Sequence, residues 1–105
     1  MAPAQAAAVS RAAKDELLAL RNLGPALRED LRRLGVDSVA QLAEQDADEL
    51  YVRLGRMDGR LHDPCVWDSL AAVIDIARGG PSQPWWAWTP IRKVRQAKGD
   101  FPSGI

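Results

Sequence analysis

Apolar residues recur at helical spacing in about five stretches of the chain, and short polar or glycine-containing connections separate them. Within each stretch the apolar positions lie three or four residues apart, which places their side chains on one face of a helix. No stretch alternates between apolar and polar residues over a useful length, so the pattern predicts no β-sheet. The predicted fold class is therefore all-α, with about five short helices.

Start and stop signals place these helices along the chain. Asp46 with Glu49 three residues later resembles a capping box, and a first-turn proline supports the starts at Pro25 and Pro64. Residues 55–61 are polar and contain glycine, so they are predicted to form a loop. The expected helices begin near Ser10, at Pro25, at Asp37 or Ser38, at Asp46 and at Asp63, and the last ends at Gly79-Gly80-Pro81.

The first two predicted helices are joined by a tight turn around Gly24. Gly24 is expected to take the positive φ that a reversal needs, and Pro25 then fixes φ for the first turn of the second helix. Gly35, after Leu34, is expected to end that helix as a left-handed residue. The stretch from Leu20 to Gly35 is thus predicted to be a helical hairpin.

The hairpin and three later motifs resemble a known family. Leu23-Gly24-Pro25, with the helix after it and residues 34–39, resembles a helix-hairpin-helix motif. The later motifs are Ala-Asp-Glu-Leu-Tyr at 47–51, His-Asp-Pro-Cys-Val at 62–66, and Pro-Trp-Trp with Thr-Pro at 84–90. In this order, from about Leu17 to Pro90, they resemble the bacterial pathogenicity-locus family, whose members are often labelled helix-hairpin-helix or mitomycin-resistance-like proteins. The resemblance implies a fold but no particular reaction.

Composition limits the chain to one small domain with tails. Of its 105 residues 47% are hydrophobic, which suffices for a single small core. The single cysteine excludes an internal disulfide and is typical of a reducing cytoplasm. No apolar run is long enough to span a membrane, and the start does not resemble a signal peptide. We expect a disordered tail at 1–10, a helix-hairpin-helix domain at 11–80, a Trp-rich segment packed on it at 81–90, and a basic flexible tail at 91–105.

Charge is balanced overall but unevenly placed. Residues 15–80 carry 13 acidic and 8 basic side chains, whereas residues 91–105 carry four basic side chains and one acidic one. Arg11 and Lys14 add two positive charges near the start. A protein that coats DNA usually has a basic field over the whole domain, so this distribution argues against that class.

The hairpin is the first candidate for function. In DNA-binding helix-hairpin-helix proteins, the turn and the following backbone amides hold a phosphate, helped by the helix dipole. Here Asn22 stands where the usual motif has glycine, which favours the alternative of a hairpin retained for packing, with its arginines on a solvated face. The phosphate-binding candidates are the N–H groups of Gly24, Ala26 and Leu27 and the side chains of Arg28, Arg32 and Arg33.

The His62-Asp63-Pro64-Cys65 sequence invites a metal or catalytic interpretation. Zinc needs four ligands, and one histidine with one cysteine cannot supply a closed structural site. A Cys-His nucleophile pair is conceivable, because a helix N-terminus lowers the pKa of a thiol. The favoured interpretation is structural: Asp63 caps the helix, Pro64 begins it, Cys65 packs and His62 bonds to nearby backbone.

The tryptophans are the second candidate for function. Three of the four lie within residues 85–88, and the prediction takes this segment to be extended. It is expected to fold over the helices as a lid, with at least one tryptophan exposed. Alternatively it stacks bases of single-stranded nucleic acid or anchors a protein partner. The residues assigned to this interaction segment are Trp85, Trp86, Trp88, Arg92, Lys93 and Arg95, with the three basic side chains expected in solvent.

The sequence as a whole favours a non-catalytic cytoplasmic module that binds DNA weakly and without sequence specificity, through backbone phosphates. Family labels alone connect this to DNA damage tolerance. The alternative is a protein–protein adaptor that uses the Trp-rich segment and helix faces. No metal, cofactor or membrane association is expected. The sequence contains no nucleotide-binding loop, catalytic carboxylate pair or nucleophile triad.

Overall fold

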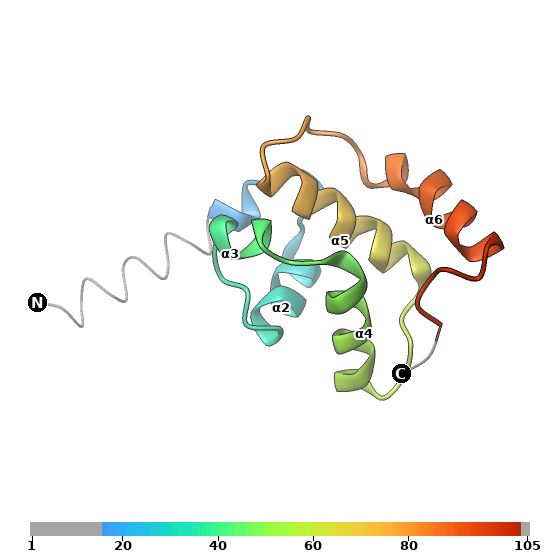
Figure 1. The fold of residues 1–105 in the computed structure, drawn as a ribbon. Helices are drawn as coiled ribbons and strands as arrows, with labels where there is room; N and C mark the ends of the chain where they lie inside the picture. The colour runs from blue at the N-terminus through green and yellow to red at the C-terminus, as the bar shows by residue number, and fades with distance from the viewer. Residues whose placement is uncertain (1–15, 104–105) are drawn as a thin grey trace, which may run out of the picture.

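The computed structural model describes residues 16–103, and every regular element among them is helical. The all-α prediction is confirmed. Residues 16–18 have a helical backbone, and the start predicted near Ser10 and the tail at 1–10 lie outside the described residues. The elements, labelled as in Figure 1, are α2 (Pro25–Arg33), α3 (Val39–Ala43), α4 (Ala47–Asp58), α5 (Pro64–Ala77), the 3₁₀ helix η1 (Trp85–Trp88) and α6 (Thr89–Ala97).

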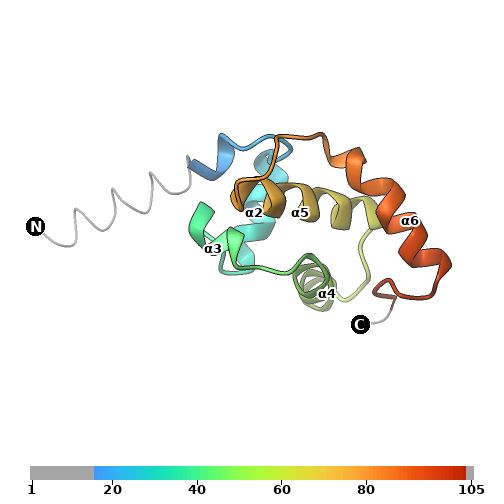
Figure 2. The same cartoon turned by 45° about the horizontal axis from the view of Figure 1, so that its top comes forward.

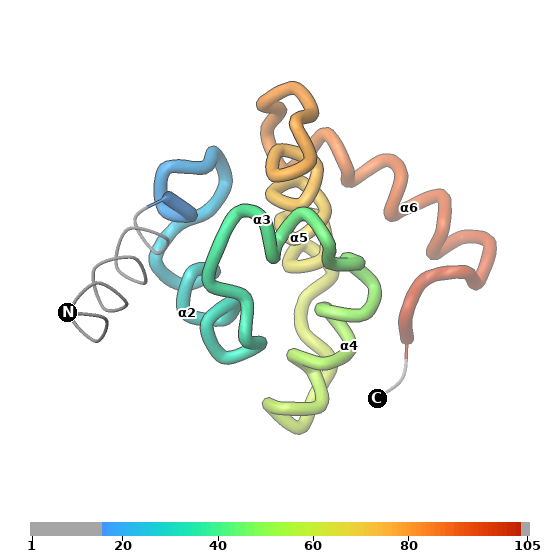
Figure 3. Tube along the Cα trace, turned by 60° about the vertical axis from the view of Figure 1, so that its left-hand side comes forward, coloured from blue at the N-terminus to red at the C-terminus, as the bar shows by residue number. Residues whose placement is uncertain are grey.

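Helix α5 is the central element of the arrangement. It contacts α3, α4, η1 and α6. Figure 3 shows α5 between α2 on one side and α6 on the other, and Figure 2 shows α6 running alongside it. Its buried side chains are largely apolar, so it supplies the surface against which the shorter helices pack.

Side-chain caps fix the starts of three helices, as the sequence predicts. Ser38 Oγ accepts a hydrogen bond from Gln41 N at 3.1 Å at the start of α3. Asp46 accepts from two backbone amides at the start of α4, and Asp63 accepts from one at the start of α5. Each cap satisfies amides that the helix itself leaves without an acceptor.

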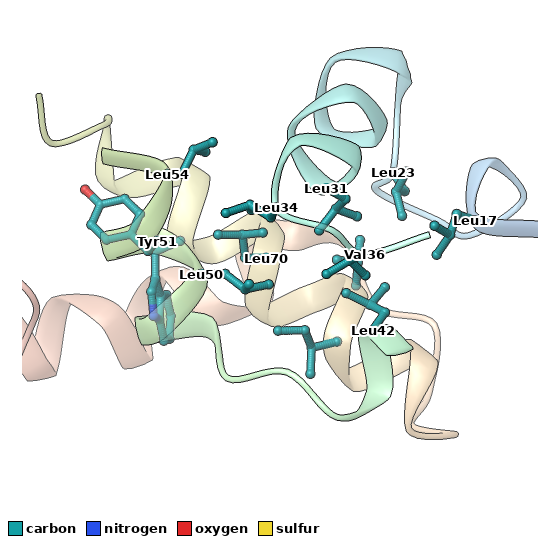
Figure 4. Close-up of a cluster of buried hydrophobic side chains, with 13 residues drawn as sticks. Leu17, Leu23, Leu31, Leu34, Val36, Leu42, Leu50, Tyr51, Leu54 and Leu70 are labelled. Atoms are coloured by element: carbon teal, nitrogen blue, oxygen red, sulfur yellow. The ribbon is translucent and has the colours of Figure 1, made fainter. Parts of the chain in front are cut away.

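The core is one continuous cluster of leucine, valine and aromatic side chains, drawn in Figure 4. Leu31 in the last turn of α2, Leu42 in α3 and Leu70 in α5 have no exposed surface. Trp67 extends the cluster toward α6, where Arg95 lies over its ring, and Tyr51 packs beside Phe101. Because side chains from α2, α3, α4 and α5 meet in a single cluster, the placement of each helix depends on the others.

The prediction that residues 55–61 form a loop is wrong for residues 55–58. Residues 55–58 continue α4, and Gly55 is buried within it. The helix ends at Gly59, whose φ is +70°, with Arg60 N donating to Gly55 O at 3.0 Å. Tertiary packing of the neighbouring Leu54 therefore outweighs the weak helix propensity of a single glycine.

The tight turn before α2 uses a different residue from the predicted one. Gly24 is extended, with φ −88° and ψ −179°, whereas Asn22 has a φ of +73°. Asparagine tolerates the left-handed conformation better than most residues. The other two expectations for this stretch hold, because Pro25 begins α2 and Gly35, with a φ of +83°, follows its end.

The C-terminal part departs most from the sequence analysis. Residues 85–88 form the 3₁₀ helix η1, so the segment is not extended. Residues 89–97 form α6, packed against α5 and η1, in place of a tail projecting into solvent. Phe101 then packs beside Tyr51 and Trp67, with ring centroids 5.6 Å from each.

Within residues 16–103, no helix has the length and the apolar character needed to cross a membrane.

Candidate functional site

The start of α2 is exposed and has no side-chain cap. Gly24 occupies the N-cap position, and no side chain accepts a hydrogen bond from the first turn. Gly24, Pro25 and Ala26 are exposed, and Leu27 is half-buried. The first intrahelical bond runs from Arg28 N to Gly24 O at 2.9 Å, so the amides of Ala26 and Leu27 precede it. This start differs from those of α3, α4 and α5, which carry caps.

The turn before α2 is bonded directly to the Trp-rich segment. Asn22 Nδ2 donates to Gln83 O at 2.8 Å, and Trp85 N donates to Asn22 Oδ1 at 2.9 Å. Arg21 Nη1 donates to Ser82 O at 2.9 Å. Figure 2 shows this turn, in blue, meeting the orange connection between α5 and α6. Asn22 thus both makes the turn and holds the beginning of η1.

Arg28 does not project from the hairpin toward solvent. Its side chain is buried, with 7% of the residue exposed, and it extends toward the loop after α2. Nη2 donates to Asp37 Oδ1 at 2.9 Å and Nη1 donates to Val36 O at 3.4 Å. Arg28 therefore ties α2 to the segment before α3, and its role in the structure is packing.

The other two arginines of α2 are paired at the surface. Arg32 bonds Glu29 one turn earlier, and both side chains are about half exposed. That hydrogen bond lowers the pKa of Glu29 and raises that of Arg32. Arg33 bonds Asp58 at the end of α4 and lies near Asp30. The exposed Arg32–Glu29 pair is easily exchanged for another partner, because surface ion pairs contribute little.

The three tryptophans of η1 have different environments. Trp88 packs against the core, whereas Trp86 is 58% exposed. The Trp85 and Trp86 rings meet edge to face, with centroids 5.7 Å apart and planes at 85°. Trp88 is thus the partly buried tryptophan that packs on the domain, and Trp86 is the exposed one.

Arg92 forms a buried ion pair and does not lie in solvent as predicted. Its Nε and Nη2 donate to the two carboxylate oxygens of Asp68 at 3.1 and 2.9 Å. Thr89 Oγ1 donates to the same carboxylate at 2.8 Å. Asp68 lies on α5 and is completely buried, so this bidentate contact joins α6 to the central helix.

Arg95 is also engaged, in a second contact between α6 and the domain. Its two terminal nitrogens donate to Asp48 at 2.9 and 2.7 Å, and Trp67 Nε1 donates to the same carboxylate at 2.7 Å. The guanidinium lies over the rings of Trp67 and Phe101. The hydrogen bond from Arg95 is the main cause of a lowered pKa of Asp48. Of the three basic residues predicted to face solvent, Lys93 does so.

Comparison with known proteins places the chain in a family. Residues 10–94 match the Cdd1 family model, described as "Pathogenicity locus", and this range covers most of the described helices. The chain belongs to the pathogenicity locus family. It is similar to the mitomycin resistance protein McrB of Streptomyces lavendulae, with 38% identity over 78 residues, which are 74% of each chain. No solved structure matches it.

In this member of the pathogenicity locus family, Asp63 caps α5 and Pro64 begins it as predicted, but Cys65 is exposed instead of packed and the His62 ring bonds a carboxylate instead of backbone. Asp63 Oδ1 accepts from Cys65 N at 2.8 Å, and His62 Nε2 lies 2.6 Å from Asp58 Oδ2. A hydrogen bond with Asp63 raises the pKa of Cys65, so the thiol is not activated as a nucleophile. Across residues 16–103, no three His, Cys, Asp or Glu side chains group as metal ligands.

The acidic partners of the C-terminal arginines were not predicted from the sequence. Asp68 lies among the buried apolar residues of α5, and Asp48 was noted only as part of the motif at residues 47–51. One signal was available: an aspartate among buried positions requires a cationic partner, and Arg92 was one of the cations that the sequence offered. Asn22 was noted as a departure from a motif, and its role in holding η1 was not foreseen.

Proposed function

We propose that this protein is a non-catalytic, cytoplasmic helix-hairpin-helix module that binds DNA through its backbone phosphates, without sequence specificity, in DNA damage tolerance. The turn and the start of α2 form the hairpin of the motif, and the amides of Gly24, Ala26 and Leu27 hold the phosphate. No metal or cofactor takes part. The similarity to a mitomycin resistance protein supports the damage-tolerance context.

The observation that carries this proposal is the uncapped, exposed start of α2. The positive end of a helix dipole and its free amides attract an anion, and α3, α4 and α5 instead use Ser38, Asp46 and Asp63 there. The extended Gly24 has no side chain above these amides, and an added Cβ would meet no atom within 4 Å. The approach to the amides is therefore open.

The charges around the hairpin support weak binding. Arg28 is committed to Asp37, so it is withdrawn from the predicted phosphate contacts. Arg32 is exposed and can exchange Glu29 for a phosphate, and Arg33 is held more firmly between α2 and α4. About two phosphate contacts would give a log–log slope of affinity against salt of about −2.

The test uses two substitutions at one position. Gly24→Asp and Gly24→Asn both supply an N-cap oxygen, which stabilises α2 by a few tenths of a kcal/mol. Only aspartate also places a negative charge where the phosphate would lie. We expect Gly24→Asp to weaken binding of a fluorescent 20-base-pair duplex much more than Gly24→Asn does, while both melt at or above the wild-type temperature.

Two results would contradict the proposal. Equal duplex affinity for Gly24→Asp and the unsubstituted protein would exclude the start of α2 as the contact. Failure of the full-length protein to bind any duplex at low salt would exclude binding of duplex DNA.

A protein–protein adaptor is the second candidate. Ile91 and Val94 on α6 are 52% and 53% exposed, and exposed apolar side chains close together are typical of interaction surfaces. This function predicts that Val94→Lys leaves duplex binding intact or strengthens it and abolishes association with a protein partner. The adaptor function becomes the leading candidate if the protein binds no DNA.

A further inference from the structure

Beside Trp86 lies an open, mostly apolar hollow between η1 and the two helices α5 and α6. Its walls include Cys65, Trp85, Trp86 and Pro90, and Lys93 lies at its edge. We propose that this hollow binds one unpaired nucleotide of single-stranded DNA, with the base stacked on Trp86 and a phosphate at Lys93. The inference rests on the proposed DNA-binding function and extends it to unpaired DNA.

Trp86 is a fixed platform rather than a loose side chain. Its ring is supported by the edge-to-face contact with Trp85. The backbone of Trp85 is held by Asn22, and its ring is half-buried. An exposed aromatic ring in a defined position loses little conformational freedom when a base stacks on it.

The charge around the hollow favours a nucleotide. Arg92 lines the hollow with its guanidinium already bound to Asp68, which leaves the exposed Lys93 as its available cation. No carboxylate lines this hollow in the described part of the chain. An aromatic face next to a single positive charge complements a base next to a phosphate.

The groove on the other side of α6 is lined by several acidic side chains. It is lined by Asp46, Asp48 and Asp75, and its Arg95 is bound to Asp48. Arg78, which also lines it, donates to the carbonyls of Ala43 and Gln45 at the end of α3. A phosphate would meet unfavourable charge there, so the Trp86 side is the one that fits nucleic acid.

The hydrogen bonds between the turn and η1 connect this hollow to the start of α2. Asn22 bonds Trp85 N, and Gly24 follows Asn22 by two residues, about 7 Å of chain at most. Trp86 is the residue after Trp85. Asn22 thus links the start of α2 to the segment that carries Trp86, so a strand that reaches both sites would place a phosphate at α2 and a base on Trp86.

The test compares single-stranded and duplex DNA with the full-length protein. Binding of a fluorescent twelve-nucleotide oligothymidine and of a twelve-base-pair duplex is measured by anisotropy at low salt. We expect Trp86→Ala to weaken single-strand binding about tenfold or more and to leave duplex binding unchanged. Trp86→Phe should retain most of the affinity, and Lys93→Gln should reduce the single-strand salt slope by about one.

Met57→Ala is the matched control, because Met57 is also an exposed apolar residue and does not line the hollow. Unchanged oligothymidine binding by Trp86→Ala would overturn the inference, and the proposed function would stand if Gly24→Asp still weakened duplex binding. Loss of oligothymidine binding in Trp86→Ala, with Gly24→Asp without effect, would support the inference and overturn the hairpin site. Binding of neither DNA would overturn both.

Discussion

Single polar side chains hold the C-terminal part of this protein in place. Asp68 is completely buried and receives three hydrogen bonds, two from Arg92 and one from Thr89. Asn22 connects the turn before α2 to η1 through two more. None of these pairings is close in sequence, so no local pattern predicts them. The residues themselves were visible, but their partners depend on how the helices pack.

Removing the Asp68 carboxylate should destabilise the fold. Asp68→Ala leaves Arg92 buried without its partner, and such a change costs about 3–5 kcal/mol. Replacing both residues by leucine should recover most of this loss, because an apolar pair of similar volume avoids the desolvation of two charges. Urea denaturation of the single and double variants measures both values. A single variant as stable as the original protein would show that the pair does not hold α6.

Asp58 should make the stability of the fold depend on pH in the acidic range. Hydrogen bonds from Arg33 and then from His62 lower the pKa of its carboxyl from 3.8 to about 2. A carboxyl whose pKa is lower in the folded than in the unfolded state stabilises the fold at pH values above its unfolded pKa. This stabilisation is lost as the pH falls through its folded pKa. We expect stability to fall between about pH 4 and pH 2. Asp58→Asn should lose less stability over that range in denaturant titrations.

At the scale of elements, the starts of α2 to α5 were predictable from the sequence and α6 was not. The starts of α3, α4 and α5 followed from Ser38, Asp46 and Asp63, because a cap acts within its own turn. Helix α6 has no side-chain cap, and its basic residues resembled a solvated tail. Its position depends on Asp48 and Asp68, which lie 47 and 24 residues from the arginines they bind.

Leu31 tests the packing of α2 against the core. It has no exposed surface, so Leu31→Ala should cost about 2–5 kcal/mol through lost burial and the cavity left behind. Leu18→Ala is the control, because Leu18 is exposed and its truncation should change stability by less than about 0.5 kcal/mol. Thermal melts of the two variants give the comparison. Equal melting temperatures would show that α2 faces the core with different residues.

At the scale of the whole molecule, the acidic domain and the basic C-terminal stretch neutralise each other. Arg92 and Arg95 bind Asp68 and Asp48, so the charge asymmetry of the sequence becomes contacts within the fold. Lys93 is left at the rim of the Trp86 hollow, and the start of α2 keeps its free amides. Because residues 15–80 carry more acidic than basic side chains, phosphate binding at the start of α2 depends on backbone donors, which explains why we propose weak binding.

The most direct test of that claim follows the backbone amides themselves. In ¹⁵N–¹H correlation spectra of the full-length protein titrated with a twelve-base-pair duplex at low salt, we expect the largest shifts at Gly24, Ala26 and Leu27. The amides near Met57, at the far end of α4, should not move. Shifts concentrated away from the start of α2, or no shift at any amide, would contradict the account.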